Sequence, residues 1–199
     1  MNRRALALLA ILTLAAAASP SRSTPAAPDP RAIVAADPAA GKILDVPFIA
    51  QGDYDCGPVA LAMGLRYQGL AADPAAINAR FASNAVAGVF TVDLLIAAGD
   101  AGADAHWVAG DWDKLRAEID AGRPPVVFQN LQINPLPARH FAIAVGYIKF
   151  KSRDYVVLHS GAEAFKMVDR REFSRQWGRT KNMMLTLQPK PAAPAGETK

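Results

Sequence analysis

The sequence predicts an α+β fold in which N-terminal helices pack on an antiparallel sheet. Helical patterns dominate the first half of the folded region and strand patterns the second half, an order that favours α+β over a doubly wound parallel sheet. The chain has 199 residues, of which 51% are hydrophobic, and it shows no internal repeat. This length and composition predict one domain, or at most two small ones, with a hydrophobic core of ordinary size.

The two ends of the chain differ from its middle. Residues 1–18 have the pattern of an export signal: a basic start, an apolar run and a small-residue cleavage site after Ala18. The apolar run is short for a membrane span, so we expect cleavage and a periplasmic or secreted protein, membrane-tethered only if the signal stays uncut. Residues 19–41 are rich in Pro and Ala and predict a linker. Residues 189–199 predict a disordered tail, which leaves 42–188 as the domain.

Each element of the domain follows from a local signal. Apolar patterns, N-capping residues and glycine stops indicate helices, and apolar or alternating runs indicate strands. Asp111, for example, predicts the start of a helix that Gly122 ends. The expected helices cover 56–68, a short stretch after 73–74, 92–98 with Thr91 as N-cap, 112–120 and 170–177, and the expected strands cover 43–49, 105–108, 125–129, 140–148, 154–159 and 182–187.

The charge distribution argues against a nucleic-acid partner. The formal net charge of +4 falls to +2 once Arg3 and Arg4 leave with the signal. No basic run interleaved with aromatic residues stands out in the remainder, and the arginines around Trp177 fit a solvated helix face. We therefore expect neither nucleic-acid binding nor stable membrane insertion after signal cleavage.

Cys56 is the only cysteine, and its surroundings indicate a nucleophile. It lies between an apolar run and a helical pattern, so it falls on the first turn of a helix, where the helix dipole favours a thiolate and lowers the thiol pKa. Gly57 permits close approach of a substrate, and Pro58 suits an early helical position. The alternative is that Cys56 is a small buried hydrophobic residue.

His140 is the natural partner for this thiol. It heads a strand whose alternation places it on a face of small residues, with room for another group beside it. An imidazole there could take the thiol proton and later protonate a leaving amine. Alone it would be an ordinary strand-edge histidine, and we expect structural roles for His106 and His159. The spacing of Cys56, His140 and His159 matches no standard zinc pattern.

The segment Gln51 to Pro58 together with the strand His140 to Tyr147 resembles the bacteriocin-processing, double-glycine-leader cysteine peptidases of the papain-like clan. The resemblance covers 42–188 and is nearest to a free-standing exported branch. It implies Cys56 as nucleophile, His140 as general base and acid, and Gln51 as oxyanion-hole donor. It also implies cleavage after small residues, often Gly-Gly, and no metal or cofactor.

The sequence departs from this family where the aspartate that orients the histidine usually stands. Ser160 and Gly161 occupy that place, so the orienting residue is Ser160, Asn130 or Asp154. The spacing from Gln51 to Cys56 is one residue shorter than the family pattern. We therefore expect an exported cysteine peptidase acting on a peptide or protein. The alternatives are an acyl-transfer or amidase enzyme with the same pair, and a peptide-binding module that has lost catalysis.

Overall fold

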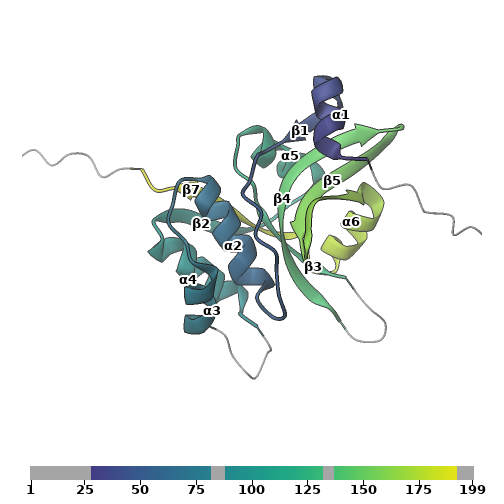
Figure 1. Cartoon of the computed structure of the whole chain (residues 1–199). Coiled ribbons are helices and arrows are strands. Elements are labelled where there is room, and N and C mark those ends of the chain that lie inside the picture. The colour runs from purple at the N-terminus through teal and green to yellow at the C-terminus, as the bar shows by residue number, and fades with distance from the viewer. Residues whose placement is uncertain (1–27, 82–87, 132–136, 192–199) are drawn as a thin grey trace, which may run out of the picture.

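The computed structural model describes residues 28–81, 88–131 and 137–191. Within them, seven strands form one antiparallel sheet in the order β2-β7-β3-β4-β5-β6, and β1 pairs with a further stretch of β4 (Figure 1). The sheet confirms the predicted antiparallel α+β architecture. Its strands are β1 (Gly41–Ile43), β2 (Ala103–Ala109), β3 (Val126–Asn130), β4 (Arg139–Phe150), β5 (Arg153–Ser160), β6 (Glu163–Asp169) and β7 (Met183–Pro189).

The helices lie on both sides of this sheet. Figure 1 shows α2, α3 and α4 gathered at one side of the molecule and α6 beyond β4 and β5 on the other. Two local signals set α5: the Asp111 carboxylate accepts from the Lys114 amide at 2.8 Å, and Gly122 follows the helix at a φ of +73°. The helices are α1 (Pro30–Ala36), the 3₁₀ helix η1 (Pro38–Ala40), α2 (Cys56–Tyr67), α3 (Pro74–Phe81), α4 (Thr91–Asp100), α5 (Trp112–Asp120) and α6 (Arg170–Gly178).

Three expectations about the elements were wrong. Residues 43–49 form no strand beyond Ile43, because their apolar pattern reflects burial: Leu44 and Val46 are 5% and 2% exposed without belonging to a strand. Residues 19–41 were expected to be a linker, but their described part contains helix α1, for which the Asp29 carboxylate is the N-cap. Thr91 is the first residue of α4 and not its N-cap.

Two hydrophobic clusters hold the helices against the sheet. One joins α2 and α4 to β7, where Leu61, Leu94 and Leu185 are fully buried. The other includes Phe173 and Trp177 of α6, whose rings lie 5.1 Å apart. Strand β4 contributes to both clusters, with Ile143 in one and Phe141 in the other, so packing holds the strand next to His140 from two sides.

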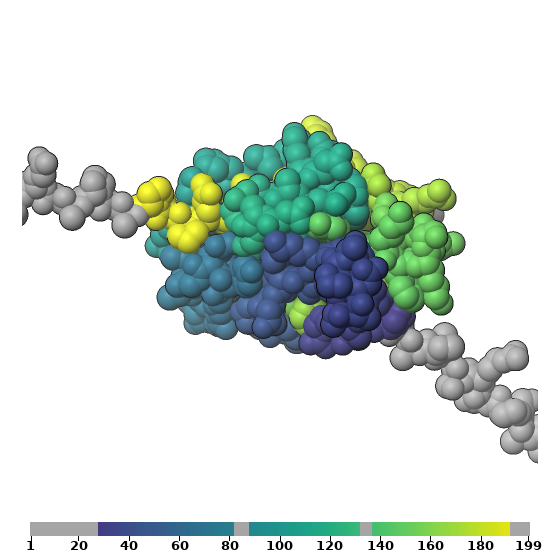
Figure 2. Space-filling model, turned by 90° about the horizontal axis from the view of Figure 1, so that it is seen from above, coloured from purple at the N-terminus to yellow at the C-terminus, as the bar shows by residue number. Residues whose placement is uncertain are grey.

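The two ends of the described chain lie on opposite sides of the body. In the space-filling view the N-terminal residues, in purple, lie beside the green region of the sheet, and the C-terminal residues, in yellow, lie at the other side beside β2 (Figure 2). The Arg31 guanidinium covers the Phe165 ring at 4.4 Å. Among the described residues, no helix has the length and apolar character that crossing a membrane requires. The predicted signal, residues 1–18, lies outside the described residues.

Candidate active site

Cys56 is the first residue of α2 and opens into a cleft of about 760 Å³. The prediction that it starts a helix is confirmed. Gly57 allows the helix to sit where it does, because a Cβ there would lie 2.8 Å from the Val89 side chain. The residues that line the cleft are 51–54, Cys56, Gly57, 88–91, Phe128, 137–141 and Gly161.

His140 lines the same cleft from the start of β4. Its Nε2 lies 2.9 Å from the Ser160 hydroxyl oxygen, a hydrogen bond between the adjacent strands β4 and β5. A neutral imidazole that donates from Nε2 keeps Nδ1 as its lone-pair nitrogen. The structure therefore brings together Cys56, His140 and Ser160, three residues that lie far apart in the sequence.

Gln51 reaches the same place from the loop before α2. Its amide nitrogen donates to the Cys56 carbonyl at 3.2 Å and to the Phe141 carbonyl at 3.1 Å. Its amide oxygen accepts from the Gly161 N–H at 2.7 Å. The structure therefore places Gln51, the predicted oxyanion donor, at the cleft, and its side-chain amide is hydrogen-bonded to backbone groups.

The other two candidates for orienting His140 lie elsewhere. Asp154 pairs with Lys149 near the far end of β5 and contacts Arg170 at 3.2 Å. With about 3.3 Å per residue, it lies roughly 20 Å along the strand from Ser160. Asn130 stands opposite Arg139 in the sheet, not opposite His140. Of the three, the structure gives only Ser160 a hydrogen bond to the His140 ring.

The electrostatics of the thiol differ from the sequence-based expectation. Burial raises the pKa of Cys56, against the lowering by backbone hydrogen bonds from Phe141 and Gly57. The Asp55 carboxylate raises this pKa further. One of its oxygens is buried and has no hydrogen-bond partner among the described residues. The expected lowering is wrong because desolvation of the thiolate outweighs the donors at the helix start.

Removing the charge next to the thiol should make Cys56 easier to ionise. In Asp55→Asn the midpoint of iodoacetamide alkylation against pH should move down, because no carboxylate then opposes the thiolate. The matched control is Asp53→Asn, a change in an exposed carboxylate of the same loop. An unchanged midpoint in Asp55→Asn, or an equal shift in both variants, would contradict this electrostatic account.

His140 is likewise held in its neutral form. Burial, with the nearby Lys166 charge second, lowers its pKa from 6.5 to about 4. A neutral imidazole can accept a proton from the thiol without first losing one. The free protein therefore contains a neutral thiol and a neutral imidazole at pH 7.

This shift predicts an acid-dependent loss of stability. Between pH 6.5 and 4 His140 binds a proton in the unfolded chain but stays neutral in the folded protein. The free energy of unfolding therefore falls as the pH drops through this window. At about 1.4 kcal/mol per unit, the loss approaches about 3 kcal/mol near pH 4. Urea unfolding should show a smaller decline in His140→Gln, whereas the exposed control His106→Gln should follow the wild type. Equal declines in all three would contradict the assignment.

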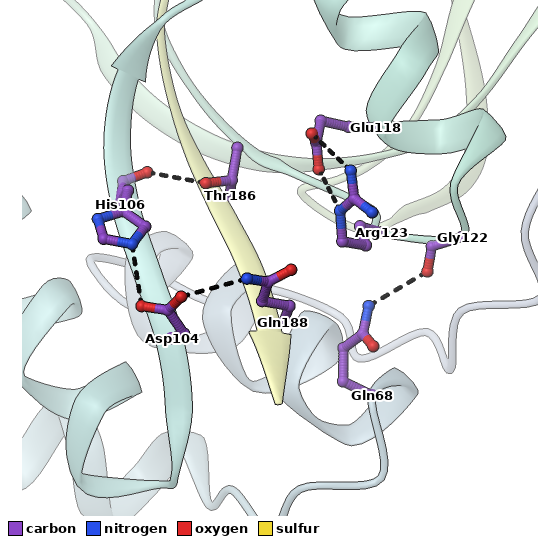
Figure 3. Close-up of polar contacts among 8 residues, drawn as sticks. All are labelled: Gln68, Asp104, His106, Glu118, Gly122, Arg123, Thr186 and Gln188. Carbon is purple, nitrogen blue, oxygen red and sulfur yellow. Dashed lines mark hydrogen bonds and ion pairs between the residues drawn. The ribbon is translucent and has the colours of Figure 1, made fainter. Parts of the chain in front are cut away.

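The remaining histidines lie outside this arrangement. His159 is fully buried; its Nε2 lies 3.0 Å from the Val46 carbonyl and its Nδ1 accepts from the Phe165 N–H at 3.1 Å. His106 belongs to a surface cluster with Asp104 and Gln188, next to the Arg123–Glu118 ion pair (Figure 3). Among the described residues, no group of three or more His, Cys, Asp or Glu could hold a metal.

Comparison with known proteins identifies the fold. Residues 43–185 match the sequence profile of the Peptidase_C39 like family. The chain is 19% identical to a C39-like peptidase structure from Bacillus anthracis, with a TM-score of 0.60 over 75% of this chain and 98% of that one. It is 20% identical to a double glycine motif protease from an AMS/PCAT transporter in complex with the leader peptide (TM-score 0.56, covering 74% and 94%). It is 18% identical to the peptidase domain of Streptococcus ComA, a bi-functional ABC transporter involved in quorum sensing (0.55, 71% and 97%). A search of curated protein sequences gave no match. These likenesses confirm the papain-like architecture expected from the sequence.

Proposed function

Because this chain belongs to the Peptidase_C39 like family, we propose that it is a cysteine peptidase that hydrolyses a peptide bond with Cys56 as nucleophile. The observation that carries the proposal is the meeting of Cys56 and His140 in one cleft, with Ser160 bonded to the far nitrogen of the imidazole. A nucleophile, a base and a group that orients the base are the parts that this chemistry requires.

The proposed reaction uses these groups in turn. Nδ1 of His140 takes the thiol proton as the Cys56 sulfur attacks the substrate carbonyl carbon, and the imidazolium then protonates the leaving amine. The thioester that forms is hydrolysed by water, again with His140 as base. The Ser160 hydroxyl oxygen accepts a hydrogen bond from Nε2–H and so holds the ring orientation. Since both partners start neutral, proton transfer accompanies attack instead of preceding it.

The oxyanion of the tetrahedral intermediate needs donors beside the sulfur. The Cys56 backbone N–H at the start of α2 is one proposed donor, as is the Gln51 amide. The Gln51 amide nitrogen is bonded to two carbonyls here, so it would have to release one of them to serve. The Cys56 N–H is accordingly the donor to which we assign the larger share.

The proposed substrate is an exported peptide or protein, cut after a small residue such as Gly. The family resemblance is the basis for the proposed cleavage after a small residue. The signal pattern of residues 1–18 is the basis for proposing an exported substrate. The similar double glycine motif protease from an AMS/PCAT transporter, which was solved with the leader peptide bound, supports a peptide substrate. No cofactor is required for the proposed chemistry.

A peptide library analysed by mass spectrometry tests the function. The wild-type protein should release fragments whose combined mass exceeds that of the parent peptide by one water. Cys56→Ala serves as the matched control and should release none. Products that carry an added amine would assign the chain to acyl transfer instead. A complete lack of reaction in reducing buffer would contradict catalysis altogether.

A peptide-binding module is the second candidate, and two observations favour it. Burial disfavours both the thiolate of Cys56 and the imidazolium of His140, and serine replaces the usual aspartate. For this candidate, library peptides should bind the wild type and Cys56→Ala equally and return intact. Cleavage by the wild type excludes it.

A further inference from the structure

Gln51 is the one described residue whose side chain bonds to three separate segments around the cleft. Its amide nitrogen donates to Cys56 at the start of α2 and to Phe141 in β4. Its amide oxygen accepts from Gly161 after β5, and its own backbone N–H donates to the Gly161 carbonyl at 3.0 Å. Each bonded residue is part of the proposed site or adjacent in sequence to it.

These bonds use the donor capacity of the amide. A glutamine side chain has two N–H groups, and here the amide nitrogen has two carbonyl acceptors. An oxyanion-hole donor must instead direct an N–H at the position of the developing charge. The observed arrangement of Gln51 is therefore that of a link between backbone segments.

The link bears directly on the reactive groups. A backbone hydrogen bond from Phe141 stabilises the Cys56 thiolate, while the carbonyl of Phe141 accepts from Gln51. Gln51 thereby fixes the residue whose backbone faces the sulfur. At its other end it holds Gly161, the residue after Ser160, and Ser160 is the partner of His140.

We propose that Gln51 is a positioning residue: its amide sets the separation of Cys56, His140 and Ser160 by tying together the backbone of α2, β4 and the turn after β5. The proposal rests on the function proposed above, because positioning matters only if these three groups react. It assigns Gln51 a role in the free protein, before any substrate carbonyl is present. An oxyanion donor acts only once the intermediate forms.

The two roles separate in experiments without substrate. Gln51→Met keeps the length of the side chain and removes all three amide bonds. Iodoacetamide alkylation of Cys56 should slow about tenfold across the pH range, because a small displacement of reacting groups lowers their rate strongly. The ring resonances of His140 should shift in the NMR spectrum, and their titration midpoint should move.

Gln68→Met is the matched control. Gln68 also donates its side-chain amide to a backbone carbonyl, that of Gly122 at 3.2 Å, and it lies at the other end of α2 (Figure 3). This variant should alkylate and titrate like the wild type. A Gln51→Met protein with wild-type alkylation and His140 resonances would overturn the proposal, even if its peptide turnover fell.

A measurement on the wild type covers the case in which Gln51→Met does not fold. The Gly161 N–H, bonded to the Gln51 side chain at 2.7 Å, should exchange with solvent far more slowly than an exposed turn amide. Fast exchange would overturn the link. None of these three readouts uses turnover, so failure to cleave any peptide would count against the proposed function and leave this test intact.

Discussion

His140→Ala should lower the rate of peptide cleavage by about 10⁴-fold or more, and Cys56→Ala should abolish covalent catalysis. The sulfur is the only proposed nucleophile, and the His140 imidazole, neutral at pH 7, is the base proposed to take its proton. Losses of this size are typical of nucleophile–base pairs. Steady-state cleavage of the best peptide from the library gives the measurement.

The double variant shows whether the pair acts as a unit. Cys56→Ala with His140→Ala should be no slower than the worse single variant, because each change alone already disables the same step. His106→Ala, which alters an exposed histidine outside the cleft, is the control and should retain full activity. More than a tenth of the wild-type rate in His140→Ala would refute the assignment of His140 as base.

Ser160→Asp should have the second largest effect, and it should activate the thiol. A carboxylate at hydrogen-bond distance from Nε2 favours the imidazolium, so the pKa of His140 should rise from its low value. Opposite charges this close shift a pKa by about 1–3 units. Proton transfer from Cys56 to His140 then becomes easier, and alkylation at pH 7 should accelerate by about tenfold or more.

Ser160→Ala is the matched variant for this prediction. It removes the hydroxyl partner of the His140 ring and adds no charge. Its cleavage rate should fall about tenfold, through looser orientation of the imidazole. NMR titration of His140 measures the pKa in each variant, and thermal unfolding reports the cost of a half-buried carboxylate. A His140 pKa that is equal in Ser160→Asp and Ser160→Ala would show that this side chain does not control the base.

The elements predicted correctly share one property, which is a strong local signal. Helix α5 has a capping aspartate, Asp111, and a glycine stop, Gly122, within a dozen residues. Helix α2 begins at Cys56 because a Gly-Pro pair and an apolar pattern follow it. Such signals depend on neighbouring residues alone, so they can be read without knowledge of the fold.

The errors arose where burial, or pairing between strands, determines the local structure. Leu44 and Val46 are buried although residues 44–50 form no strand, and apolar alternation does not distinguish a buried strand from a buried irregular segment. Strand β6 (Glu163–Asp169) was not predicted, because its exposed and half-buried residues carry a weak apolar pattern and its pairing with β5 provides the order. Helix α1 was not predicted, because it lies in a Pro- and Ala-rich segment whose composition is typical of linkers.

For the site, the sequence by itself determined the helix that begins at Cys56 and the strand that carries His140, and it supplied the proposal that these two residues react as a pair. Those assignments follow from residue type and local pattern. Only the tertiary structure decided that Ser160, and not Asn130 or Asp154, meets the imidazole, because sheet register sets which side chains face one another. It also decided the Gln51 bonds, one of which spans 110 residues. The tertiary structure also decided the direction of the Cys56 pKa shift, because desolvation depends on all the groups packed around the sulfur.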